Sequence, residues 1–304
     1  MKQYLDLMQR VLDQGTQQSN RTGVNTIFKA GDLMQFDLAD GFPVITTRKA
    51  AWKSAIGEMI GFINGYTDVK QFRDLKCKFW DANAAAPAWQ TNPNCTGPDD
   101  LGKIYGAQAR KWDTAHVSSF IVQGDDTQIN ASAEHATFDQ LASVIEQIQN
   151  NPTSRRLLVS HWRPDQFNAM ALPPCHVLYQ FLVNVEKNEL NMSMYIRSND
   201  LFLGAPANIT EYAFLLAAVA HATGYTPRIF TYFVSDAHIY VNHLDQVKTQ
   251  LARKPYALPR LKFLKPFNEI GNLSALEWLE SLHPDDFELV GYEHHPALTG
   301  EMAV

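Results

Sequence analysis

Residues 190–223 read LNMSMYIRSNDLFLGAPANITEYAFLLAAVAHAT, and this stretch is the strongest indication of the fold class. Its start, 190–196, has the composition of a strand, and 209–223 is an apolar run long enough for a buried helix. Between them, the run from Arg197 to Asn208 contains a cation, a hydroxyl, amides and a carboxylate. Polar side chains do not gather after an apolar strand for packing alone, so we expect a site at this junction.

Outward from this stretch, strand-like and helix-like segments follow one another without a regular βαβ alternation. Two short strands at 26–28 and 34–38, with a turn around Gly31, predict a hairpin. There is no Gly-rich phosphate-binding fingerprint, so the class is α+β, with one domain over residues 1–304. Further strands are predicted at 157–160, 177–185 and 229–234, and further helices at 4–12, 56–63, 138–150 and about 242–251.

Two segments do not fit this pattern of strands and helices. Residues 83–102 are rich in Ala, Pro, Asn, Thr and Asp, and predict a surface loop near the site. Residues 117–134 are polar with scattered Ser, Asp and Thr. We expect both segments to be surface insertions.

Composition excludes several classes of protein. Of 304 residues, 45% are hydrophobic and 19% charged, which is typical of a folded globular chain. A net charge of −6 gives no broad basic field, so neither a nucleic-acid polymer nor a membrane surface is expected as a partner. The start lacks a signal-peptide pattern and no apolar run is long enough to span a membrane, so we expect a cytoplasmic protein. Three cysteines without CxxC spacing indicate free thiols and no metal site.

Cys175 is the candidate nucleophile. It follows two prolines in the run Leu172-Pro173-Pro174-Cys175-His176, which restricts the backbone at the mouth of a predicted strand. A lone cysteine is more often a small buried hydrophobe, and we expect Cys77 and Cys95 to be structural. A thiolate needs nearby positive charge, and Arg155, Arg156 and Arg197 lie on flanking segments.

Several other residues predict binding of a phosphorylated pyrimidine. Arg21, in the turn Arg21-Thr22-Gly23, is a further candidate for bidentate phosphate binding. Asn208 offers both a donor and an acceptor, which suits a pyrimidine edge with one N–H and one carbonyl. Simpler readings remain open: 154–156 could be a solvated corner, and Asn208 a helix N-cap.

Two further features point to proton transfer and to hydroxyl recognition. Glu58 lies on a mostly apolar helix, where a carboxylate must be paired or have its pKa raised. His238 and Tyr240 alternate at the end of a predicted strand, so they share one face and can reach a common ligand hydroxyl.

These motifs together resemble the thymidylate synthase family over nearly the whole chain. The resemblance rests on 172–176, 197–208 and 236–240, and it extends to further short motifs. These are Arg21-Thr22-Gly23, Asp40-Gly41-Phe42-Pro43, Glu58, Trp80-Asp81, Ile104-Tyr105-Gly106, Ser154-Arg155-Arg156 and Glu301-Met302-Ala303-Val304. The resemblance implies a large bent mixed sheet flanked by helices, one sheet face forming a homodimer interface, and dUMP and 5,10-methylenetetrahydrofolate as substrates.

The resemblance also implies roles for individual residues. Cys175 would add to C6 of the uracil, and the products would be dTMP and dihydrofolate. Catalytic roles would fall to Cys175, Glu58, Tyr105, His176 and Asn208. Substrate would be bound by Arg21, Arg197, Ser198, Asn199, Asp200, Asn208, His238 and Tyr240, and by Arg155 and Arg156 of the partner subunit. The folate would be bound by Phe79, Trp80, Asp200, Ala303 and Val304, with the C-terminal carboxylate closing over the site.

Four positions depart from the common family pattern. Ala207 stands for a usual Phe, Ile196 for a Gln, Asn83 for a second Trp and Ala51 for a His. A related branch, the phage-type deoxypyrimidine hydroxymethylases, captures the methylene group with water, and a dUMP hydroxymethylase is therefore the alternative. Trp80 and the Met-Ala-Val tail favour hydride transfer, because both would keep water away.

Two hypotheses outside this class can be weighed on the same residues. A papain-like hydrolase needs a cysteine–histidine pair, but adjacent strand residues such as Cys175 and His176 are expected to face opposite ways. A non-catalytic nucleotide-binding protein could keep the arginines and Asn208. It would have little reason to keep Cys175 together with Glu58 and the tail.

Overall fold

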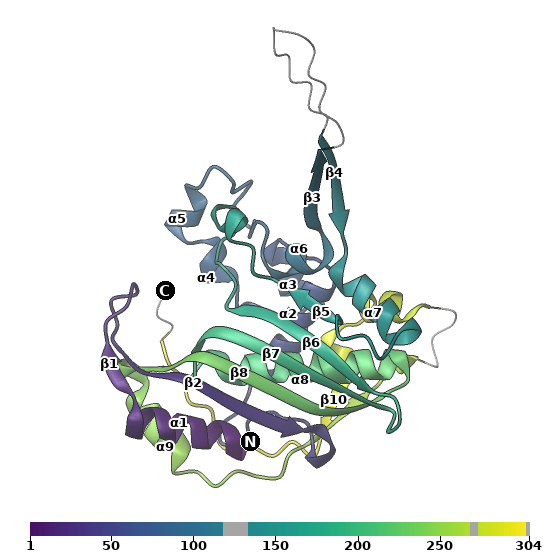
Figure 1. Ribbon diagram of the computed structural model, residues 1–304. Helices are drawn as coiled ribbons and strands as arrows, with labels where there is room; N and C mark the ends of the chain where they lie inside the picture. Colours follow the sequence, from purple (N-terminus) through teal and green to yellow (C-terminus); the bar gives the residue numbers. More distant parts are fainter. Residues whose placement is uncertain (118–132, 268–272, 302–304) are drawn as a thin grey trace.

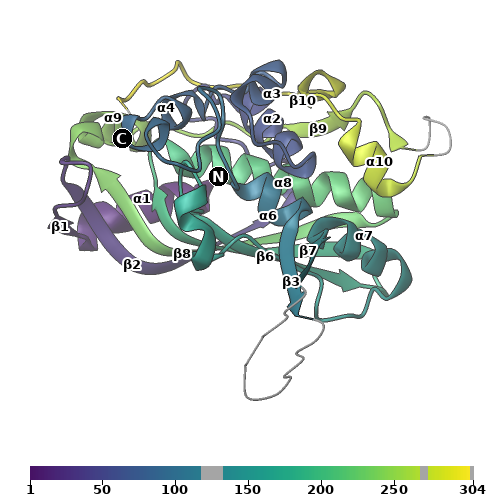
Figure 2. The same cartoon turned by 90° about the horizontal axis from the view of Figure 1, so that it is seen from above.

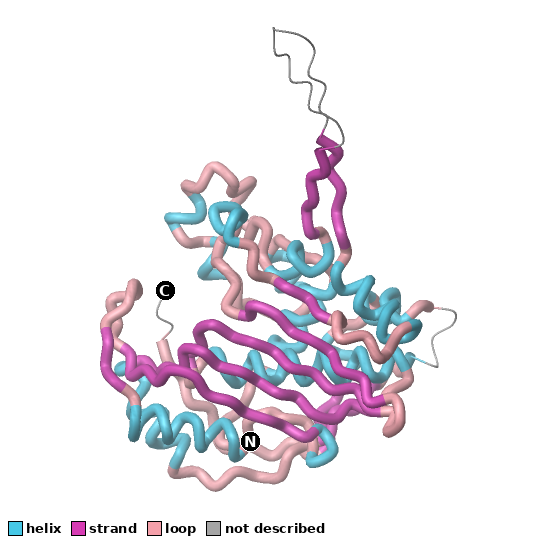
Figure 3. Tube along the Cα trace, viewed as in Figure 1, coloured by secondary structure: helices cyan, strands magenta, loops and turns pink. Residues whose placement is uncertain are grey.

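The fold is built around a six-stranded mixed sheet in which the strands lie side by side (Figure 3). The computed structural model describes residues 1–117, 133–267 and 273–301. The strand order is β1-β2-β8-β7-β6-β5. The bounds are β1 Thr16–Gln18, β2 Thr26–Asp37, β5 Leu158–Ser160, β6 His176–Asn184, β7 Glu189–Asp200 and β8 Thr226–Tyr240. Helices and a large mixed sheet together confirm the α+β class.

The helix α8 (Gly204–Thr223) makes the crossover between the two central strands. β7 and β8 are parallel, whereas their other neighbours in the sheet pair antiparallel. Parallel neighbours need a crossover connection, and α8 supplies it with side chains that are almost all buried. The helix ends at Gly224, whose φ of 80° is the left-handed conformation that glycine adopts without strain.

The helices cover one face of the sheet (Figure 1), and the view from above shows α2, α8 and α10 together on that side (Figure 2). The apolar faces of α1, β2, α2, β7 and β8 meet in the core, which includes Tyr4, Phe36, Ile60, Met194 and Phe230. The helices are α1 Lys2–Gln14, α2 Trp52–Ile63, α3 Val69–Asp74, α4 Asp81–Ala84, α5 Pro87–Gln90, α6 Tyr105–Arg110, α7 Gln140–Asn150, α9 Leu244–Leu251 and α10 Ala275–Glu280. Two small sheets pair β3 (Trp112–Val117) with β4 (Ala133–Phe138), and β9 (Arg260–Phe263) with β10 (Phe287–Val290).

The opposite face of the sheet carries apolar side chains that are exposed in this chain. Its central row runs Leu33, Phe233 and Tyr195 across β2, β8 and β7, which are direct neighbours in register. Leu158 and Leu182 on β5 and β6 are exposed as well. No helix among the described residues is both long and apolar enough to cross a membrane.

The predicted hairpin at 26–38 is wrong, because these residues form the single strand β2. Gly31 has a φ of 60°, which resembles a turn signal, yet the pairing with β8 keeps the same register on both sides of it. Ala30 pairs with Asp236 and Asp32 with Val234. The partner strand lies about 200 residues further along the chain, so local sequence could not reveal this pairing.

The two unusual segments have different outcomes. The first, 83–102, contains the helical turn α5 and part of α4, and it is anchored by Trp89. The Trp89 indole is buried, and its Nε1 donates to the Asp100 carbonyl at 2.7 Å. The second, 117–134, begins and ends in the β3–β4 hairpin, and its residues 118–132 lie outside the described part of the chain.

Several element boundaries also differ from the sequence prediction, among them the end of β7 and the start of α7. Strand β7 continues to Asp200, so the polar residues from Arg197 onward lie within the strand and not after it. The helix predicted from Phe138 begins at Gln140, because Asp139 accepts the Ala142 N–H as its N-cap and Phe138 ends β4.

Candidate active site

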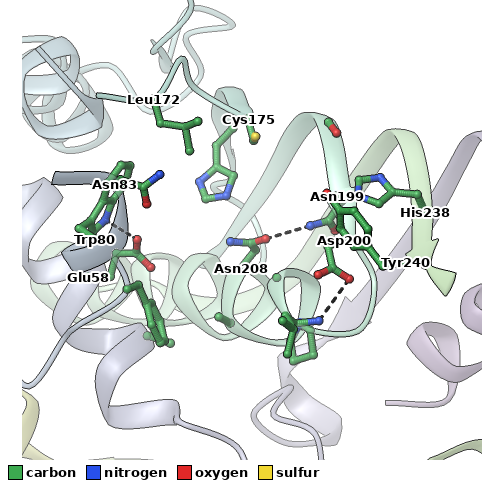
Figure 4. A pocket seen from close by; sticks show the side chains of 18 of the residues that line it. Glu58, Trp80, Asn83, Leu172, Cys175, Asn199, Asp200, Asn208, His238 and Tyr240 are labelled. Atoms are coloured by element: carbon green, nitrogen blue, oxygen red, sulfur yellow. Dashed lines mark hydrogen bonds between the residues drawn. The ribbon is translucent and has the colours of Figure 1, made fainter. Parts of the chain in front are cut away.

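A cavity of about 810 Å³ lies where the ends of β7 and β8 meet α2 and α8. Figure 4 shows Glu58, Trp80 and Leu172 on one side of it, with Asp200 and His238 on the other. The cavity brings together most of the residues that the sequence singled out. They are Arg21, Glu58, Phe79, Trp80, Tyr105, Cys175, His176, Arg197, Ser198, Asn199, Asp200, Asn208, His238 and Tyr240.

Two predicted site residues that the structure describes, Arg155 and Arg156, are not part of this cavity. Arg155 and Arg156 are exposed and lie just before β5, so in a single chain they match the reading of a solvated corner. The idea that they support a thiolate at Cys175 in the same chain is therefore wrong. Ala303 and Val304 lie outside the described residues.

Cys175 stands directly before β6, and its backbone is held from two sides. Its N–H donates to the Tyr105 hydroxyl at 2.7 Å, and its carbonyl accepts from the Arg197 N–H at 2.9 Å. Burial raises the pKa of the Cys175 thiol, while Arg197 and Arg21 act in the lowering direction and Asp236 in the raising direction. The two arginines thus favour the thiolate against the effect of burial.

Arg197 is oriented by the two prolines before Cys175. Its Nε donates to the Pro174 carbonyl at 2.8 Å, and its Nη2 to the Pro173 carbonyl at 3.1 Å. The guanidinium also lies 5.6 Å from the centre of the Trp162 ring. The two prolines therefore position both the Cys175 thiol and the Arg197 guanidinium. The remaining N–H donors of that guanidinium can bind an anion in the cavity.

Glu58 is buried on α2 beneath Trp80. The Trp80 Nε1 donates to the Glu58 carboxylate at 2.7 Å (Figure 4). Burial raises the pKa of Glu58, while the neighbouring Glu211 carboxyl group and the hydrogen bond from Trp80 act in the lowering direction. A carboxyl group with a raised pKa in the same cavity as a thiol can exchange protons near neutral pH.

Asn208 lies inside α8, whose N-cap is Leu203, so the reading of Asn208 as an N-cap is wrong. Its amide orientation is set by a hydrogen-bonded chain. The Tyr232 hydroxyl donates to Asn199 Oδ1 at 2.8 Å, and Asn199 Nδ2 donates to Asn208 Oδ1 at 3.0 Å (Figure 4). Asn199 is only 3% exposed, and its hydrogen bond fixes the orientation of the Asn208 amide.

His238 and Tyr240 both line the cavity from β8, as their alternation predicted. The His238 Nδ1 lies 2.9 Å from an Asp236 carboxylate oxygen, which fixes the ring. Asp200, beside them, accepts the Phe202 N–H at 2.8 Å, and burial raises its pKa. This end of the cavity offers hydroxyl partners and a hydrogen-bonding carboxyl group.

Cys175 and His176 both line the cavity, although adjacent strand residues were expected to face apart. The register of β6 against β7 shifts between His176 and Leu178, so regular alternation does not hold at this point. Burial lowers the pKa of His176 to about 3, which keeps the ring neutral. Among the described residues no hydrogen bond joins it to Cys175, so the pair that a hydrolase needs is not formed.

The positions that depart from the family pattern separate into two groups. Ala51, Asn83 and Ala207 line the cavity, so they shape it directly. Ile196 is buried on β7 and does not line it. Over the described residues no cluster of three metal-ligating side chains is present.

Sequence reasoning missed Glu211, which is fully buried next to Glu58. The available signal was a glutamate inside the apolar run 209–223, one helical turn after Asn208. It also missed Tyr232, whose role depends on contacts with Asn199.

Fold and site together define an α+β protein with a cysteine at the wall of a cavity of about 810 Å³. The family model for thymidylate synthase matches residues 2–304. A thymidylate synthase of Pseudomonas putida is 48% identical, and one of Pseudomonas syringae pv. tomato 47% identical, each over the full length of both chains. One of Bordetella parapertussis is 45% identical over the same extent. The chain belongs to the thymidylate synthase family, whose members are methyltransferases.

Proposed function

We propose that this enzyme converts dUMP to dTMP with 5,10-methylenetetrahydrofolate, and that dihydrofolate is the second product. The observation that carries the proposal is the cavity that holds Cys175, Arg21, Arg197 and Asn208 together. A thiol, an anion site and a pyrimidine-reading amide within one cavity suit covalent attack on a nucleoside monophosphate.

Covalent catalysis begins at the thiol of Cys175. The Cys175 thiolate adds to C6 of the uracil, and the electron pair of the C5–C6 double bond moves toward the C4 carbonyl as an enolate. C5, otherwise a poor nucleophile, then becomes reactive. Arg197 and Arg21 hold the 5′-phosphate near Cys175, where their charges also favour the thiolate.

The remaining residues bind the base and the sugar and move protons. Asn208 holds the uracil edge, with its amide fixed through Asn199. His238 and Tyr240 bind the ribose 3′-hydroxyl from the face of β8. Proton transfers through water would then involve Glu58, Tyr105 and His176, and Ser198 would add a hydroxyl to the phosphate site.

Residues from two sides of the cavity suit the folate. Phe79 and Trp80 offer aromatic surface for a flat ring, and Asp200 offers a carboxyl group for pterin hydrogen bonds. When bound, the folate supplies the one-carbon unit and the hydride. The chain would then exclude water through Trp80 and through closure of its C-terminal residues Ala303 and Val304.

A homodimer would cover the open face of the sheet. Leu33, Tyr195 and Phe233 are exposed there in one row, and burying such a face is a common basis for a stable dimer. In this dimer Arg155 and Arg156, exposed before β5, would reach the phosphate site of the partner subunit. Phosphate binding would thus require both chains.

The alternative product is 5-hydroxymethyl-dUMP, which forms if water captures the methylene group. Ala207 favours this alternative in one respect, because a small side chain leaves room beside the base. The named relatives favour the reductive reaction. Asn208, rather than an aspartate, favours uracil as the base for either reaction.

The test is to incubate the purified enzyme with dUMP and methylenetetrahydrofolate and to analyse the nucleotide by mass. We expect dTMP together with dihydrofolate, and no turnover by Cys175→Ser. The matched control is Cys95→Ser, which removes a thiol outside the cavity and should retain activity. A product heavier than dTMP by one oxygen, with tetrahydrofolate recovered, would replace the proposal with the hydroxymethylase. Tight dUMP binding without turnover would point to a binding protein.

A further inference from the structure

Glu211 is a buried carboxyl group for which the roles described above give no explanation. It lies on α8, is 0% exposed and does not line the cavity itself. Neither of its carboxylate oxygens makes a hydrogen bond of good geometry within the described part of the chain. Leaving such a group buried without a strong partner is costly, so its presence in an otherwise apolar helix needs a reason.

The ionisable group that acts most strongly on Glu211 is Glu58, on the helix that packs against α8. Helices α2 and α8 are in direct contact, and the two carboxyl groups interact with each other. Glu211 also follows Asn208 by one turn, and the Asn208 side chain contacts it. Glu211 therefore lies next to two residues that line the cavity, Glu58 and Asn208, without lining it itself.

No cation among the described residues compensates these two carboxyl groups. The other ionisable groups around them are a thiol and three phenols, all of which are neutral at pH 7 when buried. They are Cys77 after α3, Tyr105 on α6, Tyr212 on α8 and Tyr232 on β8. Two adjacent buried carboxylates cannot both ionise in such surroundings, so one proton must remain on the pair.

The location of that proton follows from the partners of each group. Glu58 receives a hydrogen bond from Trp80 Nε1 at 2.7 Å, which stabilises its ionised form. Glu211 has the Asn208 amide beside it but accepts no hydrogen bond of good geometry among the described residues, and burial together with Glu58 raises its pKa well above the usual value. The proton therefore resides on Glu211, and the negative charge on Glu58.

We propose that Glu211 is a positioning residue that carries the shared proton and donates a hydrogen bond to Glu58, which stays ionised and able to accept protons. The inference rests on the proposed function for the role of Glu58. When Glu58 accepts a proton released at the pyrimidine, the pair passes from one proton and one negative charge to two protons and no charge. Loss of one proton to solvent restores it.

A matched pair of variants tests this arrangement through the pH dependence of kcat. Glu211→Gln keeps a donor to Glu58 but cannot ionise, whereas Glu211→Leu removes the donor. In Glu211→Leu the acidic limb of the kcat profile should move up by about one to two pH units, because a hydrogen bond to a charged group is lost. In Glu211→Gln the limb should stay near its wild-type position. KM for dUMP should change little in both, since Glu211 does not line the cavity.

Infrared difference spectroscopy supplies a readout that does not require turnover. At pH 7, wild type minus Glu211→Gln should contain the stretch of a protonated carboxyl group, and wild type minus Glu58→Gln should not. Glu146→Gln, an exposed glutamate on α7, is the control and should give no such band.

Two results would overturn the proposal. One is an unchanged acidic limb in folded Glu211→Leu; the other is the absence of a protonated carboxyl band in the Glu211→Gln difference spectrum. If the enzyme shows no turnover of dUMP but the band is present, the proposed function fails while the proton-sharing pair stands.

Discussion

The hydroxyl of Tyr105 accepts the backbone N–H of Cys175 at 2.7 Å, and the next N–H, of His176, lies 3.4 Å from the same oxygen. Tyr105 comes from α6, whereas Cys175 directly precedes the sheet strand β6. A single buried hydroxyl therefore connects the backbone of Cys175, the proposed nucleophile, to the helical layer.

Tyr105→Phe should lower both stability and activity. The variant leaves the Cys175 N–H without its acceptor in a buried setting, which costs about 1–3 kcal/mol of unfolding free energy. We expect kcat to fall roughly tenfold or more, because displacement of a nucleophile by a fraction of an ångström is costly. Denaturant unfolding and initial rates measure the two effects. Tyr66→Phe is the control, because its hydroxyl has no hydrogen bond in the described structure; equal losses in both variants would contradict the prediction.

Tyr232→Phe should weaken dUMP binding, although Tyr232 does not line the cavity. The change removes the hydrogen bond that orients Asn199, and through it the amide of Asn208. We expect KM for dUMP to rise roughly three- to tenfold, the value of about one hydrogen bond. Steady-state kinetics with dUMP as the varied substrate measures it. Tyr225→Phe, in the connection between α8 and β8 and outside the cavity, should behave as wild type. An unchanged KM in Tyr232→Phe would show that Asn208 is oriented without the hydrogen bonds from Tyr232 and Asn199.

Stability should fall as the pH drops from about 6.5 toward 4. Burial lowers the pKa of His161 to about 4 and that of His176 to about 3, so the unfolded state binds more protons than the folded state in this range. Each histidine contributes a slope of up to about 1.4 kcal/mol per pH unit. Stability supplied by the neutral rings is thus present above pH 6.5 and lost below it. His161→Gln should flatten the slope in denaturant titrations, whereas His294→Gln should not; equal slopes in all three proteins would refute this account.

The proposed dimer predicts complementation between two inactive variants. Arg155→Ala/Arg156→Ala lacks the residues that reach the partner, and Cys175→Ser lacks its own nucleophile. After subunit exchange, half of the dimers are mixed and each has one complete site, so activity should recover to about a quarter of wild type. Product formation after exchange, with mixed dimers verified by native mass spectrometry, measures the recovery.

The control for complementation mixes Cys175→Ser with Glu58→Gln. Both residues line the same cavity of one chain, so no mixed dimer has a complete site and activity should stay absent. Recovery in this control, or none with the arginine variant despite verified exchange, would mean that each site is built from a single chain.

The local sequence determined the parts of this protein that depend on short-range geometry. The apolar run 209–223 became the buried portion of α8, since a long apolar stretch must be covered on all sides. His238 and Tyr240 share one face of β8 because side chains alternate along a strand. The two prolines before Cys175 identified the mouth of β6.

Contacts between residues that are distant in sequence could be established from the tertiary structure alone. The tertiary structure shows that the predicted hairpin is the single strand β2, because its backbone N–H and C=O groups pair with β8. It placed Arg155 and Arg156 outside the cavity of their own chain. It also brought Glu211 against Glu58, where burial and like charge force one proton to remain. Periodicity along a chain shows which face a side chain occupies, whereas packing between elements decides what that side chain meets.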